Sequence, residues 1–296
     1  MQYTHSPSPD FSGLWIPLVT PFRDEAVDHL ALARLVERLA LTGIAGFVVC
    51  GSTGEAAALD SNEQLAVLDT VAGAAPALPR IMGISGYHLG KTLEWVRRLG
   101  DLELTGLLVP APSYIRPSQA GLVDWFSQIA AASAVPLLIY DIPYRTGSTL
   151  TRETLLALAD HPLIRAIKDC GGDAGKTRAL IADGRLKVLA GEDAQMFSTM
   201  AEGGAGAIVA SAHLQTERFV NVLRLLHEGR LADALAQWQP LLPLIEALFV
   251  DANPGPLKAI LATEGLMQDE LRAPMTRASD ELRERLLEIQ AGLSRP

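Results

Sequence analysis

Cysteine is scarce in this sequence: only Cys50 and Cys170 occur among 296 residues. So few cysteines favour a reducing compartment and argue against a disulfide-stapled secreted scaffold. Each follows an apolar, strand-like stretch, so we expect two thiols in the core rather than a disulfide. The six histidines show no paired spacing, and no cluster of cysteines or carboxylates completes a ligand set. We therefore expect no metal chemistry.

Long apolar runs and an excess of positive charge are also missing. No run reaches the roughly 18 residues that a membrane span needs. The first ten residues are polar, with Ser-Pro steps, and lack the basic-then-apolar layout of a signal peptide. The net charge is −9, and a field of that sign repels nucleic acid and anionic membranes. We expect neither as a partner, and we expect a cytoplasmic protein.

What the sequence does contain is a regular alternation of short apolar runs with longer segments of helical period. The expected strands are Trp15–Val19, Gly46–Cys50, Arg80–Ile84, Leu107–Val109, Pro136–Tyr140, Ile164–Lys168, Lys187–Ala190 and Ala207–Ala210. A helix is expected after each strand, the second beginning at Ser61 with that residue as its N-cap. Eight such β-then-α units predict an α/β fold, the parallel (β/α)₈ or TIM barrel. A doubly wound open sheet is the alternative, because a count of units does not prove closure.

The chain changes character after the eighth unit. The segments Leu231–Val250, Pro256–Thr263 and Ser279–Leu293 are helical in period, and no strand separates them. No low-complexity linker precedes them. We therefore expect a barrel over residues 11–228 and a C-terminal helical region over 229–296 that packs on it.

Lys168 stands at the end of the sixth expected strand and is one of only five lysines. It can be a strand-end lysine whose stem lies on apolar surface while its ammonium reaches water. It can also be an amine held in a partly dry pocket to attack a carbonyl. At the ordinary lysine pKa near 10.4, only about one amine in 2500 is neutral at pH 7, so a nucleophilic lysine needs desolvation. The residues expected at the ends of the other strands decide between these two interpretations.

In a barrel, catalytic groups gather at the carboxyl ends of strands. The second strand ends in Gly51-Ser52-Thr53-Gly54-Glu55, whose hydroxyls and backbone N–H groups suit a small carboxylate. An ordinary capped loop is the alternative. The fifth strand ends in Tyr140, either a core side chain or a proton relay. Arg145 follows it as a carboxylate clamp or a surface ion-pair residue.

These stretches together carry a resemblance. Gly51–Glu55, Tyr140–Gly147 and Ile167-Lys168-Asp169 resemble the motifs of the dihydrodipicolinate synthase/N-acetylneuraminate lyase family, the pyruvate-dependent class I aldolases. The likeness covers nearly the whole chain. It implies that Lys168 forms a Schiff base with pyruvate, that Tyr140 relays protons with Ser52, and that Ser52 and Thr53 hold the pyruvate carboxylate. The backbone of Ile208 would line the same pocket.

Two further matches point to the synthase branch of the family. Arg145 stands where that branch grips aspartate semialdehyde, and Asn253–Lys258 matches its Asn-Pro-x-Pro-x-Lys motif. The resemblance then implies condensation of pyruvate with L-aspartate semialdehyde to 4-hydroxy-tetrahydrodipicolinate, in lysine and diaminopimelate biosynthesis, without a cofactor. Tyr114 would complete the relay across a subunit interface, so a homo-oligomer, a dimer or tetramer, is expected. Asp141, where asparagine is usual, and Ser52, where threonine is more common, depart from the pattern.

The family's lysine-binding cleft, where it exists, would be formed here by six residues: Ala56, Ser61, Gln64, Tyr87, Lys91 and Ser113. Lys91 in place of an acid would repel the ammonium group of free lysine. Ser113 replaces the aromatic wall that would cover the ligand's stem. We expect an enzyme that lysine does not inhibit.

Three rival functions are open at this point. Gly-Lys-Thr occurs at 90–92 and at 175–177, but a phosphate-binding Walker loop needs a glycine five positions before the Gly-Lys pair, and Ser85 and Cys170 stand there. A sister aldolase or dehydratase acting on a 2-keto-3-deoxy sugar acid or N-acetylneuraminate would use the same lysine. A keto-acid-binding protein without turnover is the third, and the intact pair of Lys168 and Tyr140 argues against it.

Overall fold

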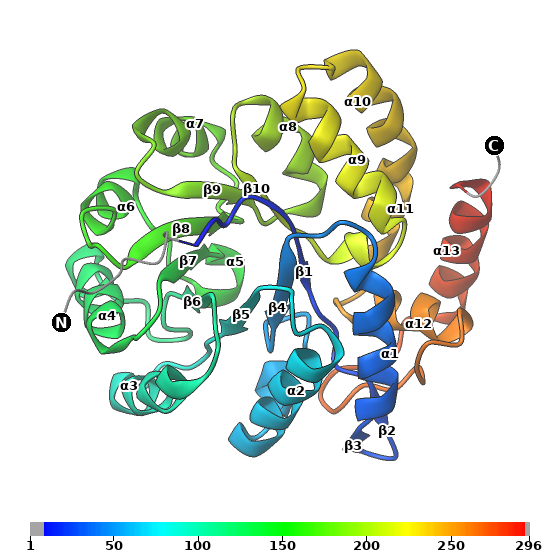
Figure 1. Ribbon diagram of the computed structural model, residues 1–296, viewed down its shortest axis with the longest axis horizontal. Helices are drawn as coiled ribbons and strands as arrows, with labels where there is room; N and C mark the ends of the chain where they lie inside the picture. Colours follow the sequence, from blue (N-terminus) through cyan, green and yellow to red (C-terminus); the bar gives the residue numbers. More distant parts are fainter. Residues whose placement is uncertain (1–8, 294–296) are drawn as a thin grey trace.

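Eight parallel strands close into a barrel in the computed structural model, which describes residues 9–293 (Figure 1). The strands are β1 (Gly13–Pro17), β4 (Gly46–Val49), β5 (Arg80–Gly83), β6 (Gly106–Pro110), β7 (Leu137–Asp141), β8 (Ile164–Asp169), β9 (Lys187–Ala190) and β10 (Gly206–Ile208). Strand β1 pairs with β4 on one side and with β10 on the other. That double pairing closes the sheet, so the predicted TIM barrel is confirmed.

The helices that follow the strands form the outer layer (Figure 1). They are α1 (His29–Ala40), α2 (Ser61–Ala74), α3 (Leu89–Arg98), α4 (Gln119–Ala132), α6 (Arg152–Leu158), α7 (Ala174–Asp183), α8 (Met196–Ala201) and α9 (Thr216–His227). In α1 the buried positions recur every three or four residues, as a helix with one apolar face requires. The expected N-cap of α2 is wrong by one residue: Asp60 accepts from the N–H groups of Asn62 and Glu63, and Glu63 completes a capping box.

The strands are buried on both faces because successive side chains point alternately into the barrel and toward the helices. Trp15, Val48 and Leu138 belong to a cluster within the barrel. Their strand neighbours, such as Phe47 and Ile139, belong to the core between the strands and the helices. Each strand therefore reads as a continuous apolar run, and that is the signal by which the sequence reveals it.

Two features of the fold were not expected from the sequence. A two-stranded hairpin, β2 (Phe22–Arg23) with β3 (Ala26–Val27), lies between β1 and α1. The expected long helix over 231–250 is divided into α10 (Leu231–Trp238), a 3₁₀ turn at Gln239–Leu241 and α11 (Leu242–Leu248). Pro240 and Pro243 account for the division, because proline cannot donate the helical hydrogen bond and is tolerated only in a first turn.

The remaining C-terminal helices lie beside α1 at the right of Figure 1. They are α12 (Gly255–Thr263) and α13 (Asp280–Leu293). Helix α11 contacts both α12 and α13, and it also contacts the 3₁₀ turns after β9 and β10. The C-terminal helices therefore reach the end of the barrel at which the strands finish. No helix within residues 9–293 is long and apolar enough to cross a membrane, and residues 1–8, where a signal peptide was considered, lie outside the described part.

Candidate active site

Lys168 and Tyr140 meet at the carboxyl ends of two neighbouring strands. They are register partners on β8 and β7, and both side chains are buried. The Lys168 Nζ lies 3.4 Å from the Tyr140 hydroxyl oxygen and 4.4 Å from the centre of the Tyr140 ring. The amine is thus held against an aromatic wall and a hydroxyl group rather than in open solvent.

The surroundings of Tyr140 keep its hydroxyl protonated at neutral pH. Burial raises the pKa of Tyr140 well above its ordinary value, and Cys170 and Glu192 act in the same direction. A hydrogen bond with Ser52 and the positive charge of Arg145 oppose that rise. Since the phenol stays neutral, it can donate a proton and receive another from a neighbouring hydroxyl.

The turn after β4 directs its two hydroxyl groups to different partners. Ser52 is exposed and reaches Tyr140, whereas Thr53 is buried and its Oγ1 accepts from Asn253 Nδ2 at 3.0 Å. Thr20 Oγ1 donates to the carbonyl of Gly54 at 2.7 Å. Gly54 also needs to be small, because a Cβ there would lie 2.8 Å from the carbonyl oxygen of Leu18.

A buried ion pair holds the last residue of the same turn, Glu55. Glu55 Oε1 lies 2.5 Å from Lys258 Nζ, and both side chains are almost completely buried. The Lys258 Nζ also donates to the carbonyl of Glu270 at 2.9 Å and lies 4.3 Å from the centre of the Phe22 ring. The Asn253–Lys258 motif therefore contacts the hydroxyl turn at both of its ends, through Asn253 and through Lys258.

Arg145 lies on the short helix α5 (Pro143–Thr146), directly after β7. It is exposed, and it lines a cavity of about 360 Å³ together with Ser52 and Tyr140. Lys168 and Thr53 do not line this cavity. The structure therefore places a cation, a hydroxyl and a phenol around one opening, with the amine behind the phenol.

Two of the expected site residues lie apart from this group. Tyr114 is 88% exposed on the loop after β6, with a φ of +74°. Its neighbour Ser113 lines the cavity, whereas Tyr114 does not. Ile208 is fully buried on β10, where it pairs with Trp15 of β1. Within one chain, then, Tyr114 faces away and Ile208 belongs to the interior of the barrel.

Sequence reasoning missed the segment after β9, which also borders the lysine. A Cβ at Gly191 would lie 2.8 Å from Lys168 Cγ, so only glycine leaves the lysine stem its place. Glu192 Oε1 accepts from the Tyr144 hydroxyl at 2.9 Å. Asp193 is buried, and burial raises its pKa to about 6 although it accepts from the Ser211 N–H. The strand-end rule that singled out Tyr140 and Lys168 could have found these residues as well.

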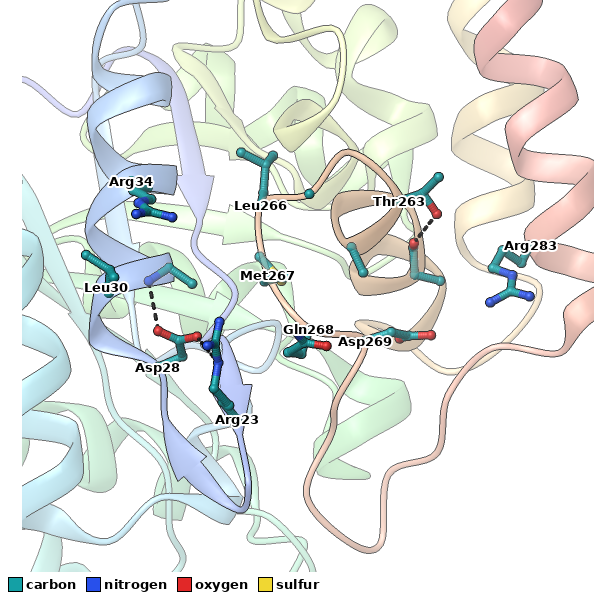
Figure 2. Close-up of a pocket in the computed structure, with 14 residues that line it drawn as sticks. Arg23, Asp28, Leu30, Arg34, Thr263, Leu266, Met267, Gln268, Asp269 and Arg283 are labelled. Atoms are coloured by element: carbon teal, nitrogen blue, oxygen red, sulfur yellow. Dashed lines mark hydrogen bonds and ion pairs between the residues drawn. The ribbon is translucent and has the colours of Figure 1, made fainter.

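Several further cavities lie outside this site, and two of them have a similar volume. One, of about 370 Å³, is lined by Ser61, Gln64, Tyr87 and Lys91, four of the six residues assigned to the lysine cleft. The other, of about 390 Å³, lies between α1 and the α12–α13 segment (Figure 2). Arg23 and Asp28 form an ion pair at its edge, at 2.9 Å. No residue of the expected catalytic set lines either cavity. Residues 9–293 contain no cluster of three or more His, Cys, Asp or Glu side chains that could hold a metal ion.

Comparison with known proteins identifies the group to which this site belongs. Residues 10–291 match the Dihydrodipicolinate synthetase family. The chain belongs to that family. It is 34% identical to 4-hydroxy-tetrahydrodipicolinate synthase 2 of Clostridium acetobutylicum over 93% of this chain and 97% of that one. It is therefore a class I aldolase/lyase-type enzyme with a dihydrodipicolinate synthase-like function, within a family that serves amino-acid biosynthesis.

Solved structures agree with this assignment. The chloride-inhibited dihydrodipicolinate synthase from Acinetobacter baumannii, complexed with pyruvate, has a TM-score of 0.92 at 31% identity, over 95% of this chain and 99% of that one. The enzyme from Cyanidioschyzon merolae with lysine bound has a TM-score of 0.92 at 29% identity, over 96% and 99%.

Proposed function

We propose that this enzyme condenses pyruvate with L-aspartate semialdehyde to 4-hydroxy-tetrahydrodipicolinate, through a Schiff base on Lys168. The observation that carries the proposal is the 3.4 Å approach of the Lys168 amine to the Tyr140 hydroxyl, behind an opening bordered by Ser52 and Arg145. The similar Acinetobacter baumannii enzyme is described as a complex with pyruvate, which supports the choice of first substrate.

In the first half of the reaction, the neutral amine of Lys168 attacks the ketone carbon of pyruvate. The resulting carbinolamine loses water and becomes an iminium. Because the iminium withdraws electrons, the pyruvate methyl group can lose a proton to give an enamine. The iminium itself is the electron sink, so the proposed reaction draws on no cofactor. Tyr140 passes protons to and from the departing oxygen, with Ser52 as its hydrogen-bonded neighbour.

In the second half, the enamine carbon attacks the aldehyde carbon of the second substrate, and the aldehyde oxygen takes up a proton. Arg145 holds the carboxylate of this substrate through charge-assisted hydrogen bonds. The substrate's own amine then attacks the iminium carbon and displaces Lys168. A six-membered ring closes, and the free enzyme returns.

Reduction with borohydride in the presence of pyruvate tests the proposal. It should convert the iminium into a stable secondary amine on Lys168, which peptide mass mapping detects. Lys187→Met is a suitable control, because Lys187 is exposed at the amino end of β9, whereas Lys168 lies near the carboxyl end of β8. An adduct on another lysine, or none, contradicts the mechanism.

A sister activity on a 2-keto-3-deoxy sugar acid or N-acetylneuraminate is the second candidate. The observation that favours it is the pair of Tyr144 and Glu192, which offers hydrogen-bonding groups for hydroxyls. A comparison of kcat/KM for aspartate semialdehyde with that for sugar-acid substrates decides between the two. A higher value for a sugar acid would replace the proposed second substrate.

We also propose a homodimer or larger assembly in the cytoplasm, in which the barrel (11–228) carries the C-terminal helical region (229–296). Tyr114 and Ile115 are both more than half exposed on one loop, and an apolar pair in such a position suits a contact with a second copy. Tyr114 would then complete the proton relay of the neighbouring subunit. Light scattering at assay concentration tests this, and a fully active monomer would rule it out.

A further inference from the structure

The first turn of α7 contains the sequence Gly-Lys-Thr at 175–177. It lacks the preceding glycine that a nucleotide-binding Walker loop requires. The two polar side chains of this turn are nevertheless buried: Lys176 is 5% exposed and Thr177 is 8% exposed. Lys176 Nζ forms an ion pair with Asp141 Oδ2 and donates to the carbonyl of Leu150 at 3.2 Å. Thr177 Oγ1 donates to Asp169 Oδ2 at 2.5 Å. A charged residue buried so deeply needs a reason.

The two carboxylates occupy corresponding places on neighbouring strands. Asp141 directly follows Tyr140 on β7, Asp169 directly follows Lys168 on β8, and the two aspartates are register partners. Because side chains alternate along a strand, Tyr140 and Lys168 point into the barrel while the aspartates point toward the helices. Two consecutive residues of α7 therefore hold the positions immediately after the two reactive groups.

The pair of carboxylates also needs the ammonium of Lys176. Asp141 is 1% exposed and Asp169 is 5% exposed. Burial raises the pKa of Asp141, Lys176 opposes the rise, and the negative charge of Asp169 adds to it. Gly171 closes this space, since a Cβ there would lie 2.6 Å from both Asp141 Oδ2 and Lys176 Nζ. Without Lys176, two buried carboxylates would face each other and push the strand ends apart.

We propose that Lys176 and Thr177 are positioning residues that hold Lys168 and Tyr140 at their reactive separation. The first turn of α7 acts as a clamp on the ends of β7 and β8: the ammonium takes one aspartate and the hydroxyl takes the other. The same ammonium donates to the carbonyl of Leu150. It therefore also fixes the C-terminal end of the segment from Asp141 to Leu150, which contains Arg145. This inference rests on the proposed role of Lys168.

Two pairs of variants test the clamp through the rate at which borohydride traps pyruvate on Lys168. In the first pair, Lys176→Met removes the ammonium but keeps an apolar stem, and it should slow trapping by at least about tenfold, because small displacements of reacting groups are costly. The pyruvate KM should change less than kcat does. Asp141→Asn combined with Lys176→Met removes both charges and with them the ion pair, so trapping should stay slow in the double variant. Recovery of the rate would show that an unpaired carboxylate, and not the lost clamp, slows the single variant.

The second pair stands on its own if Lys176→Met fails to fold. Thr177→Val keeps the shape and loses the hydroxyl, whereas Thr177→Ser keeps the hydroxyl. The valine variant should slow trapping several-fold, and the serine variant should remain near the wild type, at a temperature where circular dichroism shows all variants folded. A role in folding alone predicts lower stability for the valine variant with an unchanged trapping rate.

The outcomes separate the two proposals. If the wild type forms no adduct on Lys168, the proposed function fails. If the wild type forms it, and folded Lys176→Met or Thr177→Val forms it at the same rate, the clamp alone is refuted. Lys187→Met, at an exposed lysine, is the matched control for loss of a positive charge.

Discussion

His213 allows a prediction whose size can be worked out from the structure. It lies in the 3₁₀ turn Ala210–His213 directly after β10 and is fully buried. Its Nδ1 donates to the carbonyl of Ala210 at 2.9 Å, so its Nε2 is the acceptor for the Val19 N–H at 3.3 Å. The ring thereby joins the last strand to the segment after the first one, where the barrel closes. Protonation of Nε2 would destroy the second of these bonds.

Burial lowers the pKa of His213 from 6.5 to about 4, and the charge of Arg38 acts in the same direction. Between those pH values the unfolded chain binds a proton that the folded chain does not. The neutral ring therefore contributes stability that is complete above pH 6.5 and is lost as the pH falls toward 4. A difference of about 2.5 in pKa corresponds to about 3 kcal/mol, of which about 2 kcal/mol is lost by pH 5.

Asp193 works in the opposite direction and nearly hides this effect in the wild type. Burial raises its pKa from 3.8 to about 6, so the folded state gains stability from this group as the pH falls below 6. The two contributions are similar in size. The prediction therefore concerns the difference between the wild type and His213→Gln, in which only the histidine contribution is removed.

Urea unfolding of both proteins at pH 7.5, 6 and 5 measures that difference, at one protein concentration and with fluorescence and circular dichroism as probes. At pH 7.5 the variant should be less stable, because its amide replaces two ring hydrogen bonds imperfectly. The gap should narrow by about 2 kcal/mol at pH 5. Asp193→Asn is the control and should show the opposite trend. A gap that is constant with pH refutes the reasoning.

Three further predictions concern the site. Arg145→Ala should leave pyruvate trapping largely intact and raise the KM of the aldehyde about 10- to 100-fold, because a charge-assisted contact is worth about 1.5–3 kcal/mol; a loss confined to pyruvate binding would exclude Arg145 as the clamp of the second substrate. Lys258→Met should lower the unfolding free energy by about 3–5 kcal/mol, because it leaves Glu55 buried without a partner, and adding Glu55→Gln should recover most of that loss. A double variant as unstable as the single one would show that the unpaired Glu55 charge is not the cause. Millimolar lysine should not inhibit, since Lys91 places a positive charge in the corresponding cavity; a rate titration at constant pyruvate that shows strong inhibition overturns this.

The sequence by itself determined the order of the elements and named the candidate residues at the strand ends. Apolar runs and helical periods are local patterns, so eight β-then-α units could be predicted, and with them the barrel. Strand ends carry catalytic groups in such a barrel, so Lys168, Tyr140, Ser52 and Arg145 could be named. Local rules also produced two errors. They placed the N-cap of α2 at Ser61 instead of Asp60, and they predicted one long helix where Pro240 and Pro243 divide the segment.

Only the tertiary structure decided which distant residues meet. Asn253 and Thr53 are 200 positions apart, and Lys176 is 35 positions from Asp141. Such pairs depend on closure of the barrel and on the packing of helices against it, which no local period encodes. The Gly-Lys-Thr turn shows the difference most clearly. As a sequence it resembles an incomplete nucleotide-binding loop. In the fold it contacts the residues that directly follow Tyr140 and Lys168, because α7 packs where β7 and β8 end.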